Sequence, residues 1–175
     1  MVDITYCALF AALIASGAFV AVPVGPVPFT LQTLFVVLAG MILGPRRALL
    51  SVVVYLSLGL AAPVYAGGGC GVGTLIGPTG GFLLGFLPAA YAVGSLSSSR
   101  DPSVGRMVCA GLGGLLPLYA LGVAWLAAQQ DLGLAAAAGV LPFLAADVVK
   151  VGLAAAVASR MLSRPLGLPV PQRDR

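Results

Sequence analysis

Residues 59–86 read GLAAPVYAGGGCGVGTLIGPTGGFLLGF. The stretch has nine glycines between Gly67 and Gly85 and no charged residue. Because glycine and proline are the two poorest helix formers, we expect irregular backbone here rather than regular helix. Irregular backbone cannot lie bare in lipid, since its N–H and C=O groups would stay unpaired. The stretch therefore predicts backbone that packs into the protein near a membrane surface, where a small solute can be held.

The composition is that of an integral membrane protein. Of the 175 residues, 60% are hydrophobic and 8% are charged, and the mean hydropathy is +1.09; a soluble domain has roughly 25% charged residues. Charge-free runs cover residues 4–45, 48–99 and 107–130, and a spanning helix needs about 20 apolar residues. With the apolar segment near the C-terminus, the sequence predicts an all-α membrane protein with six transmembrane helices in a single domain, residues 1–175.

Eight of the nine basic residues fall in three clusters. The clusters are Arg46 with Arg47, Arg100 with Arg106, and Arg160 with Arg164, Arg173 and Arg175. If six helices run with both termini inside, all eight lie on the cytoplasmic side, as the positive-inside rule expects. Residues 163–175 would then form a short cytoplasmic tail. The basic pI does not indicate nucleic acid, because no soluble surface is left to carry a basic patch.

Glycine, proline and polar segments divide the chain into the expected helices. These are residues 4–20, a short helix ending near 43, residues 48–60, a helix from the GPTGG segment to 96, and residues 107–126 and 141–162. The expected outer connections are residues 23–33, the glycine-rich stretch and residues 127–139. The first of them has three prolines in six positions and cannot be helix interior; the polar residues Thr30, Gln32 and Thr33 follow directly.

The residue types present exclude most enzyme chemistry. The three cysteines, Cys7, Cys70 and Cys109, lack metal-ligand spacing, and the chain has no histidine and no glutamate. Most metal sites, histidine-based triads and paired-carboxylate mechanisms are thereby removed. The glycine-rich stretch also lacks the GK[ST] ending of a phosphate-binding loop. We therefore expect neither an enzyme nor a protein with a metal or cofactor.

Two charges lie within the body of a predicted span, Asp147 and Lys150 in FLAADVVKVGL. Each costs at least about 2.5 to 3.5 kcal/mol at a helix centre on insertion scales. At positions i and i+3 they share one helical face and can pair. Two interpretations stay open: an ion pair that only fixes helix packing, or a ligand site in which Lys150 donates to a solute and Asp147 accepts from its N–H groups.

Other candidate pocket residues come from the first two predicted outer connections. They are Thr30, Gln32, Tyr65, Gly67, Gly68, Gly69 and Thr79. The glycines would let backbone approach a bound molecule, and the helix start at Thr79 would offer free N–H groups. Tyr65 would supply an aromatic wall with a hydroxyl. A flexible connection is the alternative for the glycines, and a capping role is equally open for Thr30.

The first helix carries two small-xxx-small steps, Ala8 with Ala12 and Ala11 with Ala15. Small residues let another helix approach closely within a membrane. The steps predict close helix packing, with a partner inside this protein or with an external partner.

Three blocks of the sequence resemble the BioY family. They are PVPFTLQTLFVVLAGMILGPR (residues 26–46), YLSLGLAAPVYAGGGCGVGTLIGPTGGFLLGF (residues 55–86) and ADVVK (residues 146–150). Members are the biotin-specific substrate-binding S components of energy-coupling-factor (ECF) transporters. The resemblance covers most of residues 8–155. It implies the six-helix S-component fold with both termini in the cytoplasm, in the cell (inner) membrane of a bacterium or archaeon.

The resemblance also implies a site and partners. The biotin pocket is expected near the outer surface, closed by the connections after the first, third and fifth helices, with Asp147 and Lys150 as the biotin-contacting pair. Members also use an Asn and an Arg near the glycine block; residues 59–86 contain neither, and backbone N–H groups are the expected substitutes. The expected partners are a transmembrane coupling subunit, docking on Ala8, Ala12, Ala11 and Ala15, and two ATPase subunits.

The function implied is that of a high-affinity biotin-binding and translocating subunit of an ATP-driven vitamin uptake transporter. Biotin is the transported ligand, not a cofactor. The alternative is a solitary or ion-coupled carrier for biotin or a related small vitamin, with Asp147 as a proton site.

Overall fold

A computed structural model describes residues 2–24, 27–97 and 103–163. Residues 164–175, which make up nearly all of the predicted cytoplasmic tail, lie outside the described residues. The same holds for residues 98–102 in the predicted loop between the fourth and fifth helices. Four of the eight clustered arginines are therefore not placed by the structure.

Each of the six predicted helices is present. They are α1 (Val2–Phe19), α2 (Gln32–Leu43), α3 (Pro45–Ala61), α5 (Gly80–Ser97), α6 (Val104–Ala127) and α8 (Leu141–Leu162). Their ends lie within about three residues of the predicted positions. Among the described residues, the connections add strands β1 (Ala21–Val24) and β2 (Val27–Thr30), a 3₁₀ turn η1 (Ala66–Gly68), and short helices α4 (Gly71–Ile76) and α7 (Leu132–Gly139).

The chain is a multi-pass membrane protein by the length and composition of its helices. Four stretches in the described part are long and apolar enough to span: Pro45–Gly68, Gly80–Ser97, Val104–Ala127 and Pro142–Leu162. The apolar stretches Ile4–Phe19 and Gln32–Leu43 are shorter. At 12 residues, α2 rises only about 18 Å, against a hydrocarbon core of about 30 Å. A count of six spans stays a prediction.

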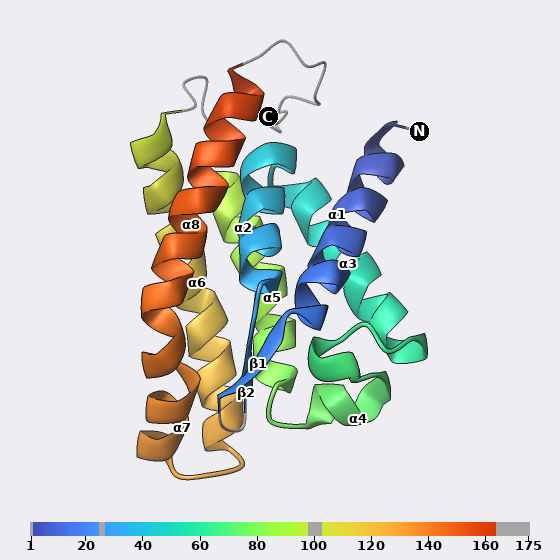
Figure 1. The fold of residues 1–175 in the computed structure, drawn as a ribbon, viewed down its shortest axis with the longest axis vertical. Helices are drawn as coiled ribbons and strands as arrows, with labels where there is room; N and C mark the ends of the chain where they lie inside the picture. Colours follow the sequence, from blue (N-terminus) through green and yellow to red (C-terminus); the bar gives the residue numbers. More distant parts are fainter. Residues whose placement is uncertain (1, 25–26, 98–102, 164–175) are drawn as a thin grey trace.

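The helices form one bundle whose two ends differ (Figure 1). Helices α2 and α5 run through the middle, with α6 and α8 on one side and α1 and α3 on the other. The β1–β2 hairpin, α4 and α7 gather at the lower end in this view, whereas α1 begins and α8 ends at the upper end. The lower end holds the three predicted outer connections, so they lie together as the sequence analysis expects.

The first connection is more regular than expected. Strands β1 and β2 form an antiparallel ribbon in which Ala21 pairs with Thr30 and Val24 with Val27. Pro23 and Pro28 face each other; proline is tolerated there because each strand of a two-stranded ribbon has an open edge. Proline excludes a helix in this connection but does not exclude an edge strand.

The expectation of irregular backbone in the glycine-rich stretch is wrong for one segment, because Gly71–Ile76 forms α4. Helix α5 begins at Gly80, within the GPTGG segment where a helix start was predicted. Carbonyls at the C-terminal end of α4 accept hydrogen bonds from α6 and the turn after it: Trp125 Nε1 donates to the Gly77 carbonyl at 3.0 Å and Gln129 Nε2 to the Ile76 carbonyl at 3.4 Å. Tertiary contacts therefore stabilise a helix that glycine propensity disfavours. The third connection, predicted as a plain loop, likewise contains α7.

Glycines at helix crossings allow the close packing of α5. A Cβ at Gly81 would overlap Trp125, and one at Gly122 would overlap the Phe82 ring. At the other end of α5, Gly94 packs against the turn between α2 and α3, where Gly44 has a φ of 77° and Pro45 opens α3. The GPRR turn predicted from the sequence is thereby held directly against α5.

Gly94→Ala tests this contact. The new Cβ would lie 2.6 Å from Pro45 Cα, and overpacking against rigid backbone costs about 1 to 3 kcal/mol. We expect the thermal unfolding midpoint of the purified protein in detergent to fall by about 5 °C. Gly152→Ala in α8 is the matched control, because a Cβ there meets no described atom within 4 Å. An equal fall in both variants would contradict the crossing as described.

Candidate functional site

A cavity lies inside the bundle near the end that carries the hairpin. Its lining residues come from β2, the start of α2, η1, α5, α6, the end of α7 and α8. They are Val27, Pro28, Thr30, Gln32, Thr33, Ala66, Thr79, Phe82, Leu83, Phe86, Leu118, Tyr119, Gly139, Phe143, Asp147 and Lys150. The cavity has a volume of about 60 Å³, which is room for several waters.

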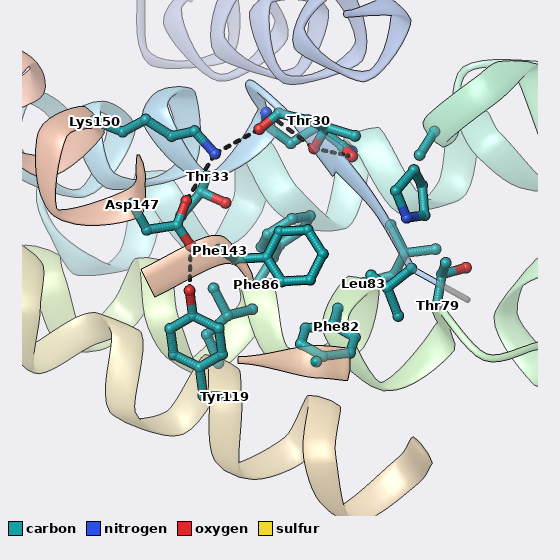
Figure 2. A pocket seen from close by; sticks show the side chains of 16 residues that line it. Thr30, Thr33, Thr79, Phe82, Leu83, Phe86, Tyr119, Phe143, Asp147 and Lys150 are labelled. Carbon is teal, nitrogen blue, oxygen red and sulfur yellow. Dashed lines mark hydrogen bonds and ion pairs between the residues drawn. The ribbon is translucent and has the colours of Figure 1, made fainter. Parts of the chain in front are cut away.

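The ion pair predicted on α8 lines this cavity (Figure 2). Lys150 Nζ lies 2.7 Å from Asp147 Oδ1, and the two residues are only 5% and 3% exposed. The hydroxyl of Tyr119 on α6 donates to Asp147 Oδ2 at 2.6 Å. Both carboxylate oxygens therefore have a donor, as a buried charge requires.

Lys150 also ties the hairpin to α8. Its ammonium donates to the carbonyl of Thr30, the last residue of β2, at 2.6 Å. The same nitrogen lies 3.9 Å from the centre of the Phe29 ring, a cation–π distance. The Phe29 ring is parallel to that of Phe143, with centroids 6.3 Å apart. One side chain of α8 thus fixes the position of β2 over the cavity.

A second polar chain runs from the cavity into α3. The Thr30 hydroxyl donates to Gln32 Oε1 at 3.0 Å, and Gln32 Nε2 donates to the buried Tyr55 hydroxyl at 2.5 Å. The side chains of Thr30 and Gln32 are therefore committed to each other and to α3. These bonds connect the junction between the hairpin and α2 to α3.

The rest of the cavity wall is apolar and aromatic. Phe82, Leu83 and Phe86 from α5 face Leu118 from α6 and Phe143 from α8. Figure 2 shows Thr79 on the side away from Asp147 and Lys150. A mostly apolar cavity with a few convergent polar groups at one end is the usual form of a small-molecule site.

The structure brings five of the predicted pocket residues together and leaves four aside. Thr30, Gln32, Thr79, Asp147 and Lys150 line the cavity, whereas Tyr65, Gly67, Gly68 and Gly69 are not among the lining residues. Tyr65 is fully buried, and its hydroxyl donates to the Leu56 carbonyl at 2.7 Å. Its ring packs edge-to-face against Tyr55 and closely on Gly59. The glycines form the η1 turn, where Gly67 and Gly68 have positive φ.

The predicted docking alanines split between two faces of α1. Ala8 and Ala12 are exposed, whereas Ala11 is only 1% exposed and Ala15 is half-buried. Ala11 belongs to the core together with Phe10 and Ile14. Ala11 is therefore inaccessible to a partner, whereas the face of α1 that carries Ala8 and Ala12 is accessible.

Sequence reasoning missed Tyr119, the aromatic wall and Thr33 as pocket residues. Tyr119 is 28 positions from Asp147, and nothing in its local sequence marks the contact. Nothing in the sequence distinguishes Phe82, Phe86 and Phe143 from phenylalanines that face lipid. Thr33 carried a usable signal, since it is a polar residue within the first turn of an apolar helix.

Comparisons with known proteins agree on one family. The BioY family model matches residues 1–165. The "Probable biotin transporter BioY" of Pyrococcus horikoshii is 40% identical over 160 residues, covering 91% of this chain and 95% of that protein. The "Biotin transporter BioY" of Thermotoga maritima is 40% identical over 155 residues, covering 87% and 91%.

A solved structure is similar in fold. It is the crystal structure of "the S-component for biotin from an ECF-type ABC transporter", with a TM-score of 0.82 and 28% identity. The similarity covers 93% of this chain and 91% of the other. The helices and connections described above therefore follow the S-component arrangement.

Tyr65→Phe tests whether Tyr65 is a structural residue. The change removes only the donor to the Leu56 carbonyl, worth about 1 kcal/mol, so we expect the thermal midpoint to fall by about 2 to 4 °C. Tyr91→Phe is the control, because Tyr91 is exposed on α5. With the exposed Cys70 and Cys109 replaced by serine, unfolding followed by the fluorescence of a thiol dye at the buried Cys7 measures both variants. An unchanged midpoint for Tyr65→Phe would show that the hydroxyl does not stabilise the fold.

Proposed function

The chain belongs to the BioY family, and we propose that it is the biotin-binding S component of an ATP-driven ECF uptake transporter. In this proposal it binds biotin with high affinity and carries it across the membrane. The family and the named relatives support biotin as the ligand. The solved neighbour, itself from an ECF-type transporter, supports ATP-driven coupling.

The observation that carries the proposal is the Asp147–Lys150 pair inside the cavity. The ureido ring of biotin has two N–H donors and one carbonyl acceptor. A carboxylate can accept from the N–H groups, and the ion pair with the lysine holds that carboxylate in place. The thioether ring and the valerate chain of biotin are apolar and suit the wall of Phe82, Phe86 and Phe143. One neutral polar head and one apolar body thus match the two ends of the cavity.

The proposal assigns energy coupling to partner subunits. The sequence has no phosphate-binding loop, so ATP hydrolysis falls to two ATPase subunits and its transmission to a transmembrane coupling subunit. The Ala8–Ala12 face of α1 is the proposed docking surface, because it is exposed and its small side chains permit close helix approach. The proposed membrane is the cell (inner) membrane of a bacterium or archaeon.

The proposed orientation places the hairpin end outside. Six spans with both termini in the cytoplasm put Arg46, Arg47, Arg106 and Arg160 on the inner side, in accord with the positive-inside rule. The cavity then opens toward the outer surface when biotin binds. Transport follows by a tilt of the whole subunit that brings the loaded cavity inward, driven by its partners.

Reconstitution tests the complete proposal. With the coupling and ATPase subunits in lipid vesicles, we expect radiolabelled biotin uptake that depends on ATP and stops with an ATPase-inactive partner. Vesicles containing this chain alone are the control. Uptake by the chain alone that an uncoupler abolishes and ATP does not affect would replace the proposal with an ion-coupled carrier.

Lys150→Ala tests the site. Loss of the ammonium releases the Thr30 carbonyl and leaves Asp147 with Tyr119 as its donor. These bonds to a charged group, worth about 1.5 to 3 kcal/mol each, position Asp147 and β2 for the ligand, so we expect biotin affinity to fall about 100-fold in isothermal titration. Arg160→Ala, at an exposed position of the same helix, is expected to bind as the unchanged protein does.

A second variant separates affinity from folding. Removing one partner of a buried ion pair costs about 3 to 5 kcal/mol, so Lys150→Ala can lose binding by losing structure. Asp147→Asn with Lys150→Met leaves no unpaired charge and is expected to keep a single cooperative unfolding transition. If this double variant binds biotin as tightly as the unchanged protein, Asp147 and Lys150 form a structural pair only.

A further inference from the structure

Thr33 lines the cavity with a hydroxyl that has no hydrogen-bond partner among the described residues. Thr33 lies in the first turn of α2, lines the cavity and is 8% exposed. Within the described part of the chain its hydroxyl makes no hydrogen bond, and the hydroxyl oxygen is not fully enclosed by protein atoms. A hydroxyl that lines the cavity without a protein partner is available to a molecule that enters it.

The other polar groups at this end of the cavity are already engaged. Thr30 and Gln32 bond to each other, and Gln32 bonds to Tyr55. Tyr119 donates to Asp147. Figure 2 shows Thr33 at the same end of the cavity as Asp147 and Lys150. Thr33 is therefore the group there with both its donor and its acceptor capacity free.

The lysine has little donor capacity left for a ligand. Of its three N–H donors, one points to Asp147 and one to the Thr30 carbonyl, and the Phe29 ring covers a further part of the ammonium. Asp147, by contrast, has about four lone-pair sites and only two donors. The site thus has spare acceptors for ligand N–H groups, whereas the ammonium has at most one N–H left for a ligand carbonyl.

We propose that the Thr33 hydroxyl is a specificity-determining group that donates to the carbonyl oxygen of the ureido ring. This inference rests on the proposed biotin-binding function. The ureido N–H groups go to Asp147 and the carbonyl goes to Thr33, so each polar atom of the ring has a protein partner. Thr79, the hydroxyl that the glycine-rich stretch contributes to the lining, lies on the side of the cavity away from Asp147 and Lys150 (Figure 2), whereas Thr33 of α2 lies on the same side as the pair.

The test compares Thr33→Val with Thr33→Ser. Valine keeps the shape and removes the hydroxyl, and serine keeps the hydroxyl. In isothermal titration of biotin-free protein, we expect valine to weaken biotin binding about tenfold, the size of one hydrogen bond, and serine to bind within about twofold of the unchanged protein. If valine fails to unfold cooperatively, Thr33→Ala takes its place. Equal losses with valine and serine, or no loss with valine, overturn the proposal.

A second ligand shows which end of biotin the hydroxyl contacts. Biotin methyl ester keeps the ureido ring and lacks the carboxylate. We expect Thr33→Val to weaken the binding of the ester and the binding of biotin by the same factor. If Thr33→Val weakens the binding of biotin but not that of the ester, the hydroxyl contacts the carboxylate end and the proposal is overturned. Failure of the unchanged protein to bind biotin would instead refute the proposed function, so the two failures are distinguishable.

Discussion

A carboxylate and an ammonium in an apolar membrane helix require partners from other elements, and this requirement organises the site. Asp147 and Lys150 neutralise each other, yet two charges out of water need further hydrogen bonds to offset desolvation. The additional bonds come from Tyr119 on α6 and from the Thr30 carbonyl of β2. The charge pair therefore defines where α6, α8 and the hairpin meet, and the cavity forms at that junction.

The glycines have the complementary role of letting the apolar wall close. Gly81 and Gly122 allow α5 and α6 to approach until Trp125 and Phe82 fill the space between them. That approach places Phe82 and Tyr119 in the wall of one cavity. It also lets the Trp125 indole donate to the Gly77 carbonyl, and this hydrogen bond caps α4. Close packing of one helix pair thus shapes the wall and fixes the segment that precedes Thr79.

The sequence predicted those features whose cause is local. The helix positions follow from charge-free runs and turn residues, and Asp147 and Lys150 stand out because charge is expensive in a span. Features with a distant cause were missed or misjudged. Helix α4 depends on caps from α6, and Tyr119 meets Asp147 across two helices. Tyr65, expected in the pocket wall, turns inward because the Leu56 carbonyl accepts from it and Gly59 leaves room for its ring.

The charge balance of the cavity constrains how a ligand such as biotin lies in it. Among the lining residues the charges are Asp147 and Lys150, and at 2.7 Å they cancel. A carboxylate placed beside them would gain little from Lys150 and would be repelled by Asp147, whereas a neutral ureido ring meets acceptors without repulsion. The valerate carboxylate is better placed at the far end, where Thr79 lines the cavity and the hairpin end of the bundle lies closest. In the proposed biotin site, the neutral pair would therefore select the head of the ligand and set its direction.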